Sequence, residues 1–425
     1  MKLAIFLWLL LGGSLAHAQN FTVLADSLHL PVGLEVSSGG RLWVVEAGYG
    51  FNDGAVSLLE GDGSIVPVIV GLPAFFDTTT HENVGPWHTL VLPANQLAVA
   101  AASVGQILIF DLTGFQPGIS PPLTISDTIR ALNVSDFSKA QGALESDPYS
   151  LAADAAHNLY VADAAANTIV KITPTGQMSV FATFPPYSNP LPFGPPYVDA
   201  VPTRIIARPG GGFLVCTLTG FPFLDGMASI FAIDAAGNVT PYATGLSQLT
   251  DLAIDANTGD VYALQIGHFD LMGMPPGYAP NSANVTRIKP DGNRETAATG
   301  FDLTAGMTLD GQGNLYVSEL AQGRVLKIAG VATAVSEKNG VAESLSLAPN
   351  PSAGPTRITF SLKTASSVQL SIRTADGRTV FNQNLGRLEA GLQQTDWKGD
   401  HQVPGLYCVE LRTDSGVASR KLVVW

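Results

Sequence analysis

The sequence predicts an all-β protein: a six-bladed β-propeller followed by a small antiparallel β-sandwich of immunoglobulin-like type. Helical periodicity is almost absent between residues 21 and 330, where short β-branched and aromatic runs alternate with Gly, Asp and Asn turns. A pattern of four strands and three turns recurs through the same region. After it, the hydrophobic alternation and the charge both change, which indicates a second domain.

The first 18 residues predict a secretory signal peptide. Lys2 precedes an unbroken apolar run from Leu3 to Leu11, and Ala16 and Ala18 are the small residues that a signal peptidase reads. The run is about half of the roughly 20 residues needed to span a bilayer. We therefore expect residues 1–18 to be cleaved, and the mature protein to be secreted without a transmembrane segment.

Six copies of the four-strand pattern are expected in residues 19–330. A β-propeller has about 4–8 such blades around a central channel. The sixth copy ends at Ile328 with only three strands, and Phe21–Ala25 resembles a fourth strand. We expect this N-terminal strand to complete the last blade and close the ring. One residue in each first strand marks the copies, at intervals of 55, 62, 54, 47 and 55 residues: Gly33, His88, Ser150, Arg204, Asp251 and Gly306.

Long insertions are expected almost entirely on one face of the propeller, which we call the long-loop face. The opposite face, where turns such as Ser37–Gly40 are tight, is the short-turn face. Long ordered loops on a rigid scaffold are where binding residues gather. Aromatic residues in these loops would equally pack against one another. The insertions are residues 73–87, 126–148, 184–202, 219–228 and 266–284.

The candidate ligand-binding residues are polar side chains that the repeat places near the long-loop face. They are His88, Arg204 and Asp251 at marker positions, and Glu46, Gln265 and Glu319 at the ends of second strands. A mixed ring of this kind can hold a small polar ligand or a metal. Acidic residues after such strands can instead bind nearby turn amides, an alternative that the sequence leaves open.

The sequence specifies no cofactor and no reaction. It contains no nucleophile elbow, P-loop or dinucleotide fingerprint. Calcium takes about 6–8 oxygen ligands, and Asp251 is the only acid among the six markers. His81, His88 and His268 are all expected near the long-loop face, which would allow zinc. Residues 19–330 hold 27 Asp and Glu against 11 Lys and Arg, a balance that repels phosphate backbones and excludes nucleic acid as a partner.

The two cysteines, Cys216 and Cys408, fall in apolar strands of different predicted domains. Both are therefore interpreted as small, buried and unpaired residues.

The small polar residues of 331–344 predict a linker, and residues 345–425 are expected to form the sandwich. Its strands are expected at 356–362, 367–374, 379–384, 393–398, 406–412 and 418–424. Pro349, Asn350 and Pro351, then Gly405 and Tyr407, then Lys421 in the terminal strand, occur in the order that resembles the C-terminal sorting domain of type IX secretion in Bacteroidetes. The resemblance implies the type IX machinery as a partner, and export to the cell surface or the medium.

The propeller region has a resemblance of its own. Pro31–Leu34, Glu82–His88 and the proline-rich 184–202 insertion are similar to the ScyD/ScyE family of secreted propellers, which is linked to a cyanobacterial sunscreen pigment. The resemblance brings no catalytic residues. We expect a secreted propeller that binds an unidentified ligand or protein partner through its long-loop face. The alternatives are a metal-dependent hydrolase or lyase at the channel mouth, and a purely structural surface protein.

Overall fold

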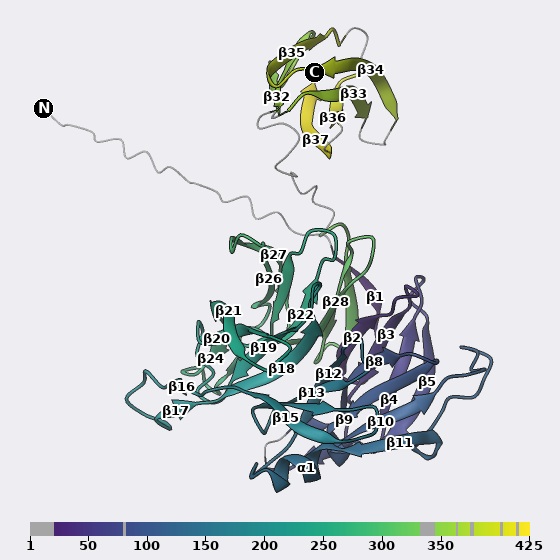
Figure 1. Ribbon diagram of the computed structural model, residues 1–425, viewed down its shortest axis with the longest axis vertical. Coiled ribbons are helices and arrows are strands. Elements are labelled where there is room, and N and C mark those ends of the chain that lie inside the picture. The colour runs from purple at the N-terminus through teal and green to yellow at the C-terminus, as the bar shows by residue number, and fades with distance from the viewer. Residues whose placement is uncertain are drawn as a thin grey trace, which may run out of the picture. The chain divides into compact units, whose positions relative to one another are not determined.

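The computed structural model describes residues 21–79, 82–331, 345–362, 364–374, 378–399, 403–413 and 416–425 (Figure 1). The chain divides into two compact units, with the boundary after residue 333. The predicted signal peptide, His81 and nearly all of the predicted linker lie outside the described residues. In the part of the chain that is described, no helix has the length and apolarity to cross a membrane.

The first unit is a propeller of four-stranded antiparallel sheets, six of them among the described residues. We number these blades in chain order. Blade 1 is β2–β5 (Pro31–Val36, Leu42–Glu46, Gly54–Leu59, Ile65–Leu72), and blade 2 is β8–β11 (Pro86–Leu92, Gln96–Ala101, Gln106–Asp111, Thr128–Asn133). Blade 3 is β12–β15 (Pro148–Ala153, Leu159–Asp163, Thr168–Ile172, Met178–Thr183), and blade 4 is β18–β21 (Ala200–Ala207, Phe213–Thr219, Ala228–Ile233, Val239–Leu246). Blade 5 is β22, β23, β26 and β27 (Leu249–Ile254, Val261–Gln265, Ala283–Ile288, Arg294–Phe301), and blade 6 is β28–β30 with β1 (Thr304–Leu309, Leu315–Glu319, Arg324–Ile328, Phe21–Ala25).

The ring closes as the sequence predicts. β1 pairs with β30, so that Phe21 lies opposite Ile328 and the N-terminal strand becomes the outer strand of blade 6. The inner strands β2, β8, β12, β18, β22 and β28 pack in that order, and β28 packs against β2. Six buried apolar clusters fill the six interfaces between neighbouring blades. Burial of apolar surface between blades, at about 25 cal/mol per Å², therefore holds the ring together.

Every inner strand carries the same irregularity. The pairing of the first and second strands shifts register within the stretches 31–34, 86–89, 148–150, 202–204, 249–251 and 304–307. All six marker residues lie in these β-bulges. A bulge turns side chains away from the regular alternation. The repeat thus places two consecutive residues of each blade, the marker and the residue before it, at the channel.

Two marker glycines show how tightly the inner strands meet. A Cβ on Gly33 would lie 2.4 Å from the carbonyl oxygen of Trp87 in blade 2, and one on Gly306 would lie 1.9 Å from that of Val32 in blade 1. Both distances are shorter than any real Cβ contact. Glycine is therefore required where blade 6 meets blade 1 and where blade 1 meets blade 2.

The insertions contain additional short elements. On the long-loop face these are β6 and β7 (Phe75–Asp77, Glu82–Val84), α1 (Val134–Ala140), β16 and β17 (Tyr187–Ser188, Tyr197–Val198), and β24 and β25 (Phe269–Asp270, Gly277–Tyr278). β16 and β17 lie on an arm that projects from the body (Figure 1).

The insertion expected at residues 126–148 begins later than predicted, because its first residues form a strand. Thr128–Asn133 is the outer strand of blade 2, and only the part from α1 onward crosses to blade 3. The extra length of blade 2 instead lies in residues 112–127, between its third and fourth strands, on the short-turn face. There Leu123 pairs with Ile69 of blade 1. The strand was missed because it is half-exposed and mixes polar and apolar side chains without clear alternation.

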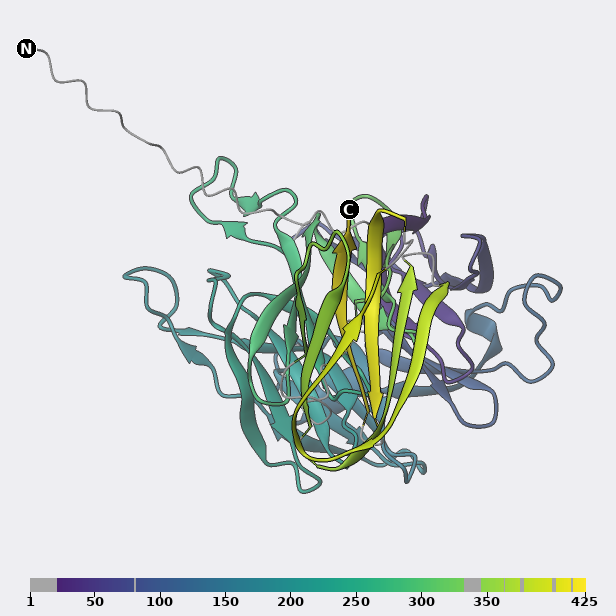
Figure 2. The ribbon, with the colours of Figure 1, turned by 90° about the horizontal axis from the view of Figure 1, so that it is seen from above.

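The second unit is an antiparallel sandwich of two sheets (Figure 2). One sheet is β31, β32 and β35 (Leu345–Ala348, Thr356–Leu362, Gly391–Trp397). The other is β34, β33, β36 and β37 (Thr379–Leu388, Ser366–Thr374, Gly405–Thr413, Gly416–Val424). One apolar cluster, which includes Phe360, Ile372 and Val409, lies between them. Because Tyr407 and Val409 face this core, Cys408 must face outward, and the expectation that it is buried is wrong. Cys216 is buried, and both are free.

Candidate functional site at the long-loop mouth of the channel

Three of the predicted ligand-binding residues meet on the channel axis. Asp251 Oδ1 lies 3.1 Å from Arg204 Nε, and Asp251 Oδ2 lies 3.4 Å from His88 Nε2. Arg204 also donates from Nη2 to Oε2 of Glu35 at 2.9 Å. The His88, Arg204 and Asp251 side chains are at least 93% buried, and that of Glu35 is 21% exposed. We call these four residues the channel network.

The channel network contacts the inner strand of every blade. Glu35, His88, Arg204 and Asp251 belong to blades 1, 2, 4 and 5. The link to blade 3 is His88 Nδ1, 3.2 Å from the carbonyl oxygen of Tyr149. The link to blade 6 is the amide of Met307, which donates to Asp251 Oδ2 at 2.8 Å. The network therefore ties the inner strands of the six blades to one another.

The charges of the channel network are shaped by burial and by one another. Burial raises the pKa of Glu35, although the neighbouring Arg204 works against this shift. Burial lowers the pKa of His88 below its ordinary value, so the imidazole is neutral at pH 7. Burial alone would lower the pKa of Arg204, but the carboxylates of Asp251 and Glu35 outweigh it and raise that pKa. A neutral His88 carries one N–H, which it can give either to Tyr149 or to Asp251.

The other three predicted residues lie apart from this network, and each anchors a loop of its own blade. Glu46 accepts the amide of His29 at 2.8 Å, Glu319 accepts that of Asp302 at 2.7 Å, and Gln265 accepts that of Ser247 at 3.2 Å. In each case the amide comes from the segment that enters the first strand of the same blade. Asp163 does the same in blade 3, where it accepts the amide of Asp147 at 2.7 Å. These side chains therefore bind backbone amides of nearby loops, which is the alternative that the sequence left open.

A second ring of residues lies one position before the markers, on the side of the long-loop face. Trp87 and Tyr149 form its aromatic side, with ring centroids 5.6 Å apart. Val32 and Ala305 pack with them in one apolar cluster, together with residues of the entering loops. Thr203 and Thr250 occupy the equivalent bulge positions of blades 4 and 5, and the hydroxyl of Thr203 donates to the carbonyl oxygen of Leu249 in blade 5. We call these six residues the mouth ring. The mouth ring was not predicted from the sequence, although each of its residues directly precedes a marker residue of the repeat.

Two polar features accompany the aromatic side of the mouth ring. The buried hydroxyl of Thr250 has no hydrogen-bond partner among the described residues. The indole Nε1 of Trp87 donates to Oδ1 of Asp147 at 2.8 Å, and burial, with the nearby Asp163 and Glu82 carboxylates, raises the pKa of Asp147 to about 7. The mouth thus combines an aromatic wall, a hydroxyl and a carboxyl group that titrates near neutral pH.

The loops around the mouth pack partly on themselves. Phe223 contacts Phe269 at 5.1 Å between centroids, and Phe269 contacts Tyr278 at 5.2 Å. The same two loops are joined by His268 Nδ1, 2.5 Å from Asp225 Oδ2. His268 and His88 therefore hold separate partners. Among the residues that the structure describes, no three His, Cys, Asp or Glu side chains are grouped to hold a metal ion.

The predicted sorting residues gather where the Pro-Asn-Pro turn meets the terminal strand. Asn350, between Pro349 and Pro351, donates to the carbonyl oxygen of Lys421 at 2.7 Å and accepts the amide of Val423 at 2.9 Å. Tyr407 is buried, and its hydroxyl donates to the carbonyl oxygen of Val403. Gly405 opens β36 opposite Val424. The Asn350 side chain and the backbone of β36 therefore hold the last strand of the chain in place.

Comparison with known proteins identifies this second unit. Residues 346–425 match the family described as a secretion system C-terminal sorting domain. This domain directs type IX secretion, so the protein is exported to the cell surface or the extracellular space. No curated protein sequence matches the chain.

Solved structures similar to the chain include proteins of different kinds. A streptogramin B lyase shares 14% identity over 72% of this chain and 96% of its own, with a TM-score of 0.43. A gluconolactonase from Xanthomonas campestris shares 11% identity over 72% and 88%, with a TM-score of 0.47. PorZ, a surface component of the type IX secretion system of Porphyromonas gingivalis, shares 13% identity over 92% and 59%, with a TM-score of 0.38. At such identities the activities of these proteins do not transfer to this chain.

Proposed function

We propose that this exported propeller binds a small ligand at the mouth ring on its long-loop face, and that the ligand joins an apolar or aromatic body to a cationic group. The observation that carries the proposal is the wall formed by Trp87 and Tyr149 beside the carboxyl group of Asp147. Aromatic faces attract cations, by about 0.5–2 kcal/mol depending on desolvation. The acidic body concentrates cations at its surface in addition.

The channel network would form the floor under a ligand at the mouth ring. His88 and Asp251 contact each other and backbone groups of other blades, and Arg204 is ion-paired to Asp251 and Glu35. Nε and Nη1 of Arg204 have no hydrogen-bond partner among the described residues. A ligand at the mouth ring would lie above them on a preformed floor. The buried Thr250 hydroxyl would then find the hydrogen-bond partner it lacks in the described structure.

The test uses the full mature chain and benzyltrimethylammonium as the probe, with benzyl alcohol as its neutral counterpart. Isothermal titration calorimetry on the wild type and on Trp87→Leu measures the contribution of the aromatic wall. We expect the cation to bind more tightly than the alcohol, and Trp87→Leu to weaken it about tenfold, which corresponds to about 1.4 kcal/mol. Trp43→Phe, in the core between blades 1 and 2, is the matched control. Equal affinity in the wild type and Trp87→Leu would refute the proposal.

The alternative function is a metal-dependent hydrolase or lyase with its site at the same mouth. It predicts stoichiometric metal in protein purified from its own culture without chelators, and activity that chelation abolishes. The likeness of residues 21–330 to ScyD/ScyE propellers supports an exported binding protein without naming its ligand. Elemental analysis of the mature protein separates the two functions.

A further inference from the structure

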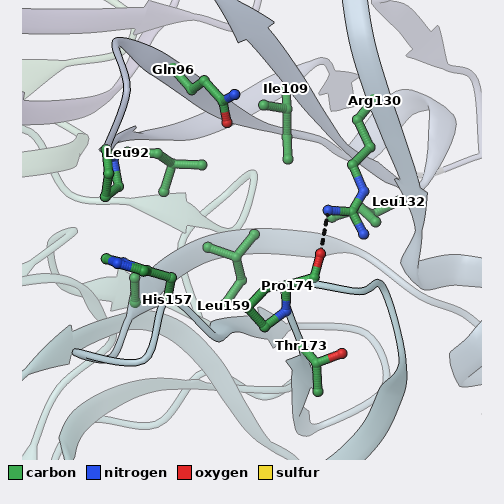
Figure 3. Close-up of a pocket in the computed structure, with 11 residues that line it drawn as sticks. Leu92, Gln96, Ile109, Arg130, Leu132, His157, Leu159, Thr173 and Pro174 are labelled. Atoms are coloured by element: carbon green, nitrogen blue, oxygen red, sulfur yellow. Dashed lines mark hydrogen bonds between the residues drawn. The ribbon is translucent and has the colours of Figure 1, made fainter.

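A separate cavity opens on the short-turn face, between blades 2 and 3 (Figure 3). Its volume is about 240 Å³. The floor is the outer end of the apolar core between the two blades, where Ile109, Leu132 and Leu159 are 5–7% exposed. Leu92 completes the apolar side. Apolar cavities with a few placed polar groups are the usual form of small-molecule sites.

Arg130 is the charged group of this cavity, and the structure holds it in place. It projects from β11, the strand that sequence reasoning missed, and its Nη1 donates to the carbonyl oxygen of Pro174 at 2.9 Å. Gly176, at a φ of +90°, leaves room for the guanidinium, because a Cβ there would lie 2.6 Å from Arg130 Nη2. A guanidinium fixed in this way loses little rotamer freedom when it binds a ligand.

The charge around Arg130 is unusual for this acidic propeller. No acidic residue lines the cavity, and its other polar side chains include Gln96 and His157. Among the described ion pairs, none includes Arg130. By contrast, the cavity of about 830 Å³ between the turns of blades 5, 6 and 1 is lined by Asp255 and Asp310. The guanidinium thus keeps donors that no carboxylate of the described structure occupies.

We infer that this cavity is a binding site for a small organic carboxylate, with the carboxylate on Arg130 and the hydrocarbon part on the floor of Ile109, Leu132 and Leu159. Figure 3 shows Arg130 at one end of this floor and Gln96 directed toward the same space. Guanidinium donors match a carboxylate in geometry as well as charge. The volume is below the roughly 300–1,000 Å³ of drug-sized sites, so the ligand is about the size of benzoate or hexanoate.

The experiment titrates the full mature chain with benzoate and hexanoate, and with benzyl alcohol as the uncharged control, by ligand-observed NMR. A ligand of this size is expected to bind in the millimolar range, since small ligands gain at most about 1.5 kcal/mol per heavy atom and usually far less. We expect both carboxylates to bind at least fivefold more tightly than the alcohol. Comparable binding of benzyl alcohol would overturn the role of the charge.

Two arginine variants locate the site. Arg130→Gln keeps the length of the side chain and a donor but removes the charge, and is expected to weaken benzoate binding at least fivefold. Arg294→Gln is the matched control, because Arg294 also donates to a backbone carbonyl, that of Thr244, in an exposed position of blade 5. Unchanged affinity in Arg130→Gln, or equal losses in both variants, would overturn the inference. Trp87→Leu should leave benzoate binding intact, so the result is independent of the mouth ring.

Discussion

Replacing Arg204 by methionine tests whether the channel network holds the ring together. The substitution keeps most of the side-chain volume and removes the cation that pairs with both of two buried or half-buried carboxylates, Glu35 and Asp251. Each of the two ion pairs, at 2.9 and 3.1 Å, corresponds to on the order of 5 kcal/mol at an effective dielectric constant of about 20. Desolvation of the three charges offsets most of this attraction. Removing one partner of a buried pair costs about 3–5 kcal/mol, and we expect that loss at pH 7.

The pH dependence of this loss follows from Glu35. Burial already raises the pKa of Glu35 in the folded wild type, and Arg204 opposes the shift. Without the guanidinium the pKa rises further, so the folded variant favours the protonated acid. A raised folded pKa means that stability is greatest below the unfolded value and decreases as the pH rises through the folded value. The difference between wild type and Arg204→Met should therefore widen from pH 5 to pH 8.

Urea unfolding at pH 5, 7 and 8 measures this difference. Arg287→Met is the matched control, because Arg287 is equally buried and pairs with Asp260 and Glu295 inside one blade. We expect the control to lose stability without loosening the ring, so that hydrogen exchange in β1 and β30 accelerates only in Arg204→Met. A loss below about 1 kcal/mol, or one that does not change with pH, would show that the network does not join the blades.

Three further outcomes are expected. Asp147→Asn should gain up to about 4 kcal/mol over the wild type at pH 8 and almost nothing at pH 4. The folded pKa of Asp147 is about 7, and each pKa unit above the value of a free carboxyl corresponds to about 1.4 kcal/mol, so the wild-type carboxyl becomes progressively unfavourable as the pH rises from 4 to 7. Equal urea midpoints of the two proteins at both pH values would contradict this. Asn350→Ala should cost about 1–3 kcal/mol in the sandwich by freeing two backbone groups of β37, measured by hydrogen exchange there. Deletion of residues 345–425 should leave the protein in the periplasm, as cell fractionation would show, and normal export would refute the sorting role.

The propeller could be predicted from the sequence because its signals are local and repeated. Strand alternation, turn residues and spacing are properties of short windows, and each recurs through the chain. The closing strand could be predicted too, since a sixth blade with three strands leaves an open edge that Phe21–Ala25 can complete. The exception is β11, whose half-exposed side chains have no regular pattern.

The site was predictable only in part, because channel contacts depend on side chains from distant blades. Spacing placed His88, Arg204 and Asp251 on the same ring, but it could not show that they bind one another. Glu35 was missed, although it lies two residues after the marker Gly33 and is the only charged residue of β2. The mouth ring was missed because an ideal strand would turn the residue before each marker away from the channel, and the bulges alter that direction.

The closure of blade 6 has a consequence for the order of events during export. A chain that crosses a membrane from its N-terminus delivers β1 first and β30 about 300 residues later. Until Ile328 has emerged, β1 has no partner, and its unpaired edge is of the kind that favours aggregation. The sorting domain follows within the next 20 or so residues. All strands of the ring precede the sorting domain in the chain, so β1 and β30 can pair, and the last open edge of the ring can close, before the sorting domain is complete.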